Sequence, residues 1–152
     1  MSTYQILLVL HIACIAVWFG GSISLPGRLR RGLAAGDAEF KLVAAEIARG
    51  FRLSLMFGIL TLVTGLILVS DRGGFAHVSK AIHMGLGLTM LMLLLEFFIN
   101  RPASNRISQI MINGEDRTLI KPLKTRLAIS SGIGQLLWLI VLGLMISQRG
   151  IK

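Results

Sequence analysis

Residues 4–25 read YQILLVLHIACIAVWFGGSISL, an unbroken run of 22 residues without an Asp, Glu, Lys or Arg side chain. As an α-helix this run measures about 33 Å, which is enough to cross the hydrocarbon core of a bilayer. Three more runs of this character follow, at residues 53–70, 81–99 and 127–147, and Glu96 is the one charged residue within them. The pattern predicts four membrane-spanning helices.

The composition agrees with this interpretation. Of the 152 residues, 54% are hydrophobic, and the mean hydropathy is +0.75. A soluble domain of this length needs more polar surface. We therefore predict an all-α fold, in which residues 1–152 form a single integral membrane domain, a four-transmembrane-helix bundle. The expected spans are about 4–25, 53–70, 77–99 and 124–147. No Lys or Arg precedes Arg28, so the first span is expected to remain as a helix rather than act as a cleaved signal peptide.

The net charge of +9 is distributed unevenly. Six basic residues lie in each of two loops, residues 27–52 and 100–126, whereas the opposite side carries Arg72, Lys80, Arg149 and Lys152. Basic loops usually face the cytoplasm. This sidedness predicts N-out/C-out topology in a bacterial inner (cytoplasmic) membrane. The expected partner of the protein is the lipid bilayer, and nucleic acid is not expected as a partner.

Breakers and helical periodicity place the remaining segments. Leu25-Pro26 is expected to end the first helix, and residues 38–50 read as a cytoplasmic helical extension that continues into the second. The third helix is expected to begin near Phe75. An apolar stripe in the second basic loop is expected to lie in the membrane interface, and it consists of Ile107, Ile110 and Met111.

The second span carries small residues at helical spacing, namely Ser54, Gly58, Thr61 and Gly65. Small residues allow close helix packing in membranes, which is the ordinary reading of such a stripe. A flat macrocycle would need similar small residues, so the stripe alone does not separate these two readings.

Two histidines could carry chemistry. His11 and His83 lie in spans that run in the same direction, each about eight residues from the expected outer end. Paired imidazoles at one depth in a bundle can hold a metal or the iron of a heme. The alternative is that each imidazole is only hydrogen-bonded to a Ser, Thr or carbonyl group of a neighbouring helix. His77 lies on a different face and is expected at the outer interface.

Further residues surround this pair. Trp18 follows His11 on one helical face, and Gly87 follows His83 and leaves room for a ring. Lys80 and Arg72 lie on the outer side, where they could contact heme propionates or a substrate carboxylate. For Lys80, reaching toward the lipid interface is the equally favoured alternative.

Other polar residues in the spans have structural explanations. Glu96 is expected to form an ion pair with Arg52 or Arg126 at the cytoplasmic end of the bundle. Gln135 and Trp138 share one face of the fourth span, and Gln135 is expected to make an interhelical hydrogen bond.

Two local motifs resemble HemJ-like and CopD-like four-helix integral membrane proteins. The first is the run HIACIAVWFGG from His11, followed by Leu25-Pro26 and Arg28, and the second is residues 75–80, FAHVSK. The second motif is offset by one residue from the family pattern, and GRLRR stands where that family has an aromatic, histidine-rich stretch.

The resemblance implies a heme b-binding membrane redox protein of porphyrin biosynthesis. The implied reaction is that of a HemJ-like oxidoreductase, the oxidation of the porphyrin precursor protoporphyrinogen IX, with quinone as a conceivable acceptor. His11 would then be a heme ligand or catalytic residue, and Lys80 a catalytic or propionate-binding residue. The alternative function is a non-enzymatic membrane subunit, or a carrier of copper or a small molecule of the CopD-like type. A homo-oligomer or a partner membrane subunit is compatible with both functions.

Overall fold

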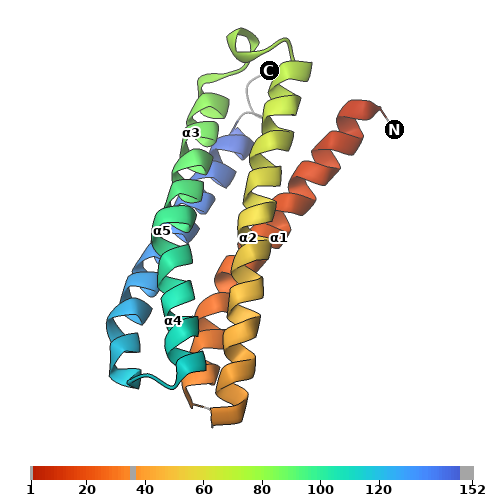
Figure 1. The fold of residues 1–152 in the computed structure, drawn as a ribbon. Coiled ribbons are helices and arrows are strands. Elements are labelled where there is room, and N and C mark those ends of the chain that lie inside the picture. The colour runs from red at the N-terminus through yellow and green to blue at the C-terminus, as the bar shows by residue number, and fades with distance from the viewer. Residues whose placement is uncertain (1, 35–36, 148–152) are drawn as a thin grey trace.

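The chain folds as an up-and-down bundle of long helices. A computed structural model describes residues 2–34 and 37–147, and the two described ends of the chain lie at the same end of the bundle (Figure 1). The helices are α1 (Thr3–Ala34), α2 (Asp37–Asp71), α3 (Lys80–Leu95), α4 (Arg101–Asn113) and α5 (Ile120–Ser147). Short helical turns connect them, namely η1 (Phe75–His77), the π-helical η2 (Glu96–Asn100) and η3 (Arg117–Leu119).

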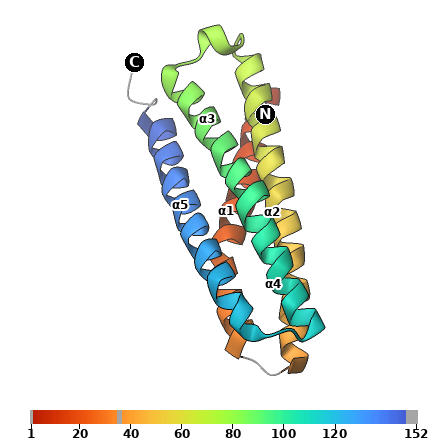
Figure 2. The same cartoon turned by 60° about the vertical axis from the view of Figure 1, so that its left-hand side comes forward.

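The predicted all-α bundle is confirmed. Within the described part of the chain, four helical segments are long and apolar enough to cross a membrane: Thr3–Ser24, Ala45–Asp71, Lys80–Asn113 and Ile120–Ser147. The third segment is one continuous rod built from α3, η2 and α4, as Figure 2 shows. Many large apolar side chains of the four segments are exposed on the surface of the bundle, as expected where lipid is the solvent.

One predicted helix end is wrong. We expected the first helix to stop at Leu25-Pro26, but α1 continues through both residues to Ala34. Proline removes a single backbone hydrogen bond, and membrane bundles tolerate it where neighbouring helices hold the segment. Here α1 packs along α2 more extensively than any other two helices pack together. The extension predicted at residues 38–50 does continue into the second span, because α2 is unbroken at Gly50.

The turn between α2 and α3 moves the start of the third helix. Gly73 and Gly74 have φ angles of 90° and 87°, a backbone region that favours glycine. The chain then makes the short turn η1 and enters α3 only at Lys80. The expected start of the third helix near Phe75 is therefore wrong by about five residues, because the residues from Phe75 to Ser79 belong to the turn and not to α3.

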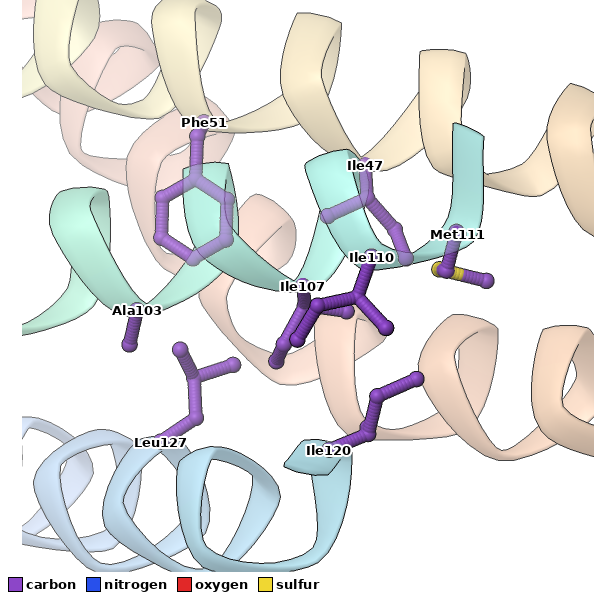
Figure 3. Packing of buried hydrophobic residues seen from close by; sticks show 8 residues of the cluster. All are labelled: Ile47, Phe51, Ala103, Ile107, Ile110, Met111, Ile120 and Leu127. Carbon is purple, nitrogen blue, oxygen red and sulfur yellow. The ribbon is translucent and has the colours of Figure 1, made fainter. Parts of the chain in front are cut away.

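The tightest apolar packing lies at the end of the bundle where α1 meets α2. Figure 3 shows this inner core, which α2, α4 and α5 build from Ile47, Phe51, Ala103, Ile107, Ile110, Met111, Ile120 and Leu127. The stripe of Ile107, Ile110 and Met111 was expected in the membrane interface, but each of its side chains is 1% exposed. The stripe faces inward because α4 lies against α2 and α5.

The small-residue stripe of α2 is a packing face. A Cβ atom added at Gly58 would lie 2.7 Å from Leu93 Cδ2 and 2.9 Å from Trp18 Cε2. A Cβ atom at Gly65 would lie 3.2 Å from His11 Cε1. These approaches are closer than ordinary carbon contacts. The absence of side chains at the two glycines thus allows α1 and α3 to approach α2, which is the first of the two readings above.

Candidate functional site

His11 is buried between α1 and α2. Its Nδ1 lies 2.8 Å from Thr64 Oγ1, and the Thr64 hydroxyl itself donates to the Leu60 carbonyl at 2.7 Å. The hydroxyl proton is therefore used, so His11 Nδ1–H is the donor and Nε2 carries the free lone pair. This is the hydrogen-bonded arrangement that the sequence left open as the alternative to ligation.

His83 lies in a different environment. It is exposed in the first turn of α3, where its Nδ1 lies 3.1 Å from the Ser79 carbonyl oxygen. Its ring also contacts the Phe75 ring, with centroids 5.7 Å apart. Because α3 begins at Lys80, His83 is three residues from the helix start, whereas His11 is eight residues from the start of α1. The described structure does not bring the two rings together.

The other predicted site residues are also dispersed. Trp18 is buried at 5% exposure against Gly58, whereas Gly87 and Lys80 are exposed on α3. Arg72 donates a hydrogen bond to the Tyr4 hydroxyl, and its guanidinium carbon lies 5.3 Å from the Tyr4 ring centroid. Among the residues that the structure describes, no three His, Cys, Asp or Glu side chains are grouped to hold a metal.

His77 is exposed in the turn between α2 and α3, and its Nδ1 lies 2.9 Å from the Gly73 carbonyl oxygen. This bond ties the imidazole to the turn itself. The place of His77 at the outer interface stays a prediction.

Glu96 is the functional candidate that the structure brings forward. Its side chain is 6% exposed, at the junction of α3 and η2. The predicted ion pair is wrong, since Arg52 and Arg126 are exposed and the one ion pair among described residues joins Arg106 to Glu115. The physical reason is that both arginines lie on faces turned away from the interior of the bundle.

The π-helical turn shapes the surroundings of Glu96. The Arg101 N–H donates to the Glu96 carbonyl, five residues back, in place of the usual α-helical bond. Asn100 Nδ2 donates to Glu96 Oε2 at 2.9 Å, so the π-helical turn joins its first and last side chains. Pro102 follows directly and has no N–H to continue a regular ladder. Single π-helical turns within longer helices frequently occur at functional sites.

A cavity of about 340 Å³ adjoins this carboxyl group. Residues of α1, α2, α3 and α5 line it, together with Glu96 and Asn100 of η2. Its polar walls come from Ser22, Ser24, Arg28, Ser54, Glu96, Asn100, Ser130, Ser131 and Gln135, and its aromatic walls from Trp18, Phe19, Phe51 and Trp138. We call this space the Glu96 cavity. It lies within the bundle and borders the inner core at Ile47 and Phe51.

Several polar atoms of the cavity wall are buried without a partner. They are Ser54 Oγ, Asn100 Oδ1 and Ser130 Oγ, on side chains that are 4% to 6% exposed. The Ser54 side chain lies beside the Glu96 carboxyl group but makes no hydrogen bond of normal geometry. An unsatisfied buried polar group costs about 1–3 kcal/mol. The cavity therefore combines space with unused hydrogen-bonding capacity.

The sequence contained part of this signal. Glu96 is the single charged residue within the four apolar runs, and Gln135 lies deep in the fourth. Ser54 was assigned to the small-residue stripe and Ser130 was not singled out, because serine is common in membrane spans and only the folded bundle brings both to the cavity beside Glu96. The expected interhelical hydrogen bond of Gln135 is not among the bonds that the described residues form, but Gln135 does line the cavity.

Comparison with protein-family models, curated proteins and solved structures found no match to this chain.

Proposed function

We propose that this protein binds a small polar molecule inside the membrane, in the Glu96 cavity, and acts as a carrier or as a binding subunit of a membrane complex. The observation that carries the proposal is the buried Glu96 carboxyl group beside a cavity with unpartnered polar atoms. Ionisable side chains within membrane bundles are costly and usually serve function. A volume of about 340 Å³ lies at the lower end of the range for ligand pockets.

The proposal includes the location and orientation. The two basic loops lie at the end of the bundle that holds the inner core, and the described chain ends lie at the opposite end. The positive-inside tendency supports placing the inner core in the cytoplasm of a bacterial cell. The Glu96 cavity then lies in the cytoplasmic half of the membrane.

A cavity-filling substitution tests this function. A Cβ atom added at Gly134, which lines the cavity on α5, meets no atom within 4 Å. Gly134→Leu should therefore fill space without a backbone clash. Gly143→Leu is the matched control, because Gly143 is equally unobstructed on the same helix but does not line the cavity.

The measurement is a thermal-shift screen of small polar molecules on the purified full-length protein in detergent. Ligands at 100 times their Kd should stabilise the wild type by about 2.7 kcal/mol. The Gly143→Leu control should respond equally, and Gly134→Leu should not respond. Equal responses of all three proteins would place binding outside the cavity and contradict the proposal.

Heme b binding is the second candidate, supported by the position of His11. Thr64 orients Nδ1 and leaves Nε2 as the ligating atom, which is how oriented histidine ligands are commonly held. The fit is incomplete, because His83 is exposed on α3 and supplies no second imidazole at this place. Copper faces the same lack of grouped ligands among the described residues. We derive no porphyrin oxidation or quinone reduction from this arrangement.

An optical spectrum tests the heme candidate directly. If His11 ligates heme b, the purified protein shows a Soret band that His11→Ala removes and His83→Ala leaves unchanged. A preparation from heme-supplemented cells without a Soret band would refute this candidate and leave the cavity proposal unaffected.

A further inference from the structure

The Glu96 cavity contains a carboxyl group that forms no ion pair with any residue whose side chain the structure describes. Asn100 Nδ2 occupies Oε2, but no Lys, Arg or His among the described residues forms an ion pair with Glu96. A carboxylate inside a membrane bundle requires compensation by an opposite charge or by hydrogen bonds. The structure supplies one hydrogen bond and an adjoining space, so a bound cation would complete the site.

The unpartnered atoms near Glu96 favour a ligand that donates hydrogen bonds. Asn100 Oδ1 can only accept, and Ser54 Oγ and Ser130 Oγ each have acceptor capacity. With the Glu96 carboxylate, they place several acceptor oxygens on the part of the wall around Glu96, where the two serine hydroxyls can also donate. A primary ammonium group carries three N–H donors and a positive charge, and therefore satisfies both needs.

The remaining walls suit the body of such a ligand. Trp18, Phe19 and Trp138 line the cavity, and the rings of Phe19 and Trp138 stack with centroids 3.8 Å apart. Aromatic rings attract cations through their faces and bury apolar groups. On these grounds we infer that the Glu96 cavity binds a small molecule with a protonated amine, whose ammonium group contacts Glu96 and whose apolar part lies among the aromatic rings.

Arg28 adds a second possible contact. Its Nη1 lies 3.7 Å from the Cβ position of Gly50, and both residues line the cavity. Arg28 is about one turn beyond Ser24 on α1, so its positive charge lies at the end of the cavity that borders the inner core. A ligand that also carries a carboxylate could pair with this guanidinium. The shared chemistry is the ammonium group, and its source is either a simple amine or an amino-acid zwitterion.

Three probes of similar shape separate these cases. They are 2-phenylethylamine, phenylalanine and the neutral 2-phenylethanol, titrated by isothermal calorimetry into the purified full-length protein. We expect saturable binding of at least one of the two ammonium compounds and at least tenfold weaker binding of the alcohol. Preference for the amine over phenylalanine identifies a simple cation, and the reverse preference identifies a zwitterion held by Arg28.

Substitutions then assign the contact. Glu96→Gln keeps the shape and removes the charge, and it should weaken ammonium binding at least tenfold. Glu115→Gln, a glutamate of the exposed ion pair outside the spans, is the matched control and should bind as the wild type does. Ser130→Ala should weaken binding severalfold, and it provides the test if Glu96→Gln fails to fold.

The inference rests on the proposed function, and the outcomes separate the two. If the alcohol binds as tightly as the amines and Gly134→Leu abolishes this binding, the cavity is a ligand site but the ammonium inference is wrong. The inference is also overturned if Glu96→Gln, or Ser130→Ala in its place, binds the amines as tightly as the wild type. If Gly134→Leu leaves all binding intact, both the proposed function and the inference fail.

Discussion

The approach of α1 and α3 to Gly58 makes a quantitative prediction for Gly58→Ala. The added methyl would lie 2.7 Å from Leu93 Cδ2, 2.9 Å from Trp18 Cε2 and 3.1 Å from Trp18 Cζ2. Leu93 can rotate its terminal methyl away, but the Trp18 ring is rigid and 5% exposed. Inserting a methyl into well-packed surroundings costs about 1–3 kcal/mol.

The helical preference of alanine opposes this cost. Replacing glycine by alanine within a helix is favourable by about 1 kcal/mol. Because the Trp18 ring cannot yield, we place the packing cost near the upper end of its range and expect a net loss of about 2 kcal/mol in the free energy of unfolding. Gly87→Ala is the control, since its Cβ position meets no atom within 4 Å, and only the favourable change of about 1 kcal/mol should remain.

Reversible unfolding in mixed detergent and SDS micelles, followed by circular dichroism, measures both values. A double-mutant cycle with Trp18→Phe adds a second test, because the two changes should be non-additive if the indole ring is the obstacle. A Gly58→Ala protein as stable as Gly87→Ala would refute the claim that Gly58 sets the distance between these helices.

The inner core, the second loop and the proposed orientation supply three more predictions. Ile107→Ala should lower the free energy of unfolding by about 2–5 kcal/mol. Ile112 is 53% exposed, so Ile112→Ala should change this free energy by no more than about 0.5 kcal/mol. Equal losses of stability in the two variants would contradict the inward position of the stripe. Hydrogen bonds from Thr118, chiefly from its backbone N–H, lower the pKa of Asp116 below its ordinary value of 3.8. The unfolded chain therefore binds the Asp116 proton more readily than the folded protein does. The contribution of Asp116 to the free energy of unfolding is present above pH 3.8 and is lost as the pH falls through the lower folded-state pKa. An NMR titration midpoint of Asp116 at or above 3.8 would disprove this. If the basic loops face the cytoplasm, a cysteine introduced by Glu115→Cys should not react with membrane-impermeant thiol reagents in intact cells and should react after lysis. Labelling in intact cells would show that the orientation is the opposite of the proposed one.

The architecture was largely predictable, whereas the candidate site was not. Uncharged runs predicted the four spans because helix length and hydrocarbon thickness are simple physical constraints that act on contiguous sequence. The small-residue stripe of α2 likewise indicated close packing. The helix ends were predicted less well, since Pro26 was tolerated within α1 and the Gly73-Gly74 turn displaced the start of α3 to Lys80.

The depth comparison of His11 and His83 depended on that helix start. It also assumed that the two faces turn toward each other, which periodicity cannot establish. In the fold His11 of α1 contacts Thr64 of α2, and His83 is exposed on α3. Whether two side chains on separate helices meet depends on how each helix is rotated and on which helices are adjacent. The sequence pattern of a single helix determines neither.

By itself, the sequence determined that this chain is a membrane-spanning helical bundle with one charged residue inside its apolar runs. Only the tertiary structure decided what surrounds that residue. Packing of α1, α2 and α5 around Glu96 turns serines from different helices toward a common space and leaves Arg52 and Arg126 exposed, outside that space. The hydropathy of a span is a property of contiguous residues and is the same for any arrangement of the helices. A cavity between helices forms only when the packing and rotation of the helices are fixed.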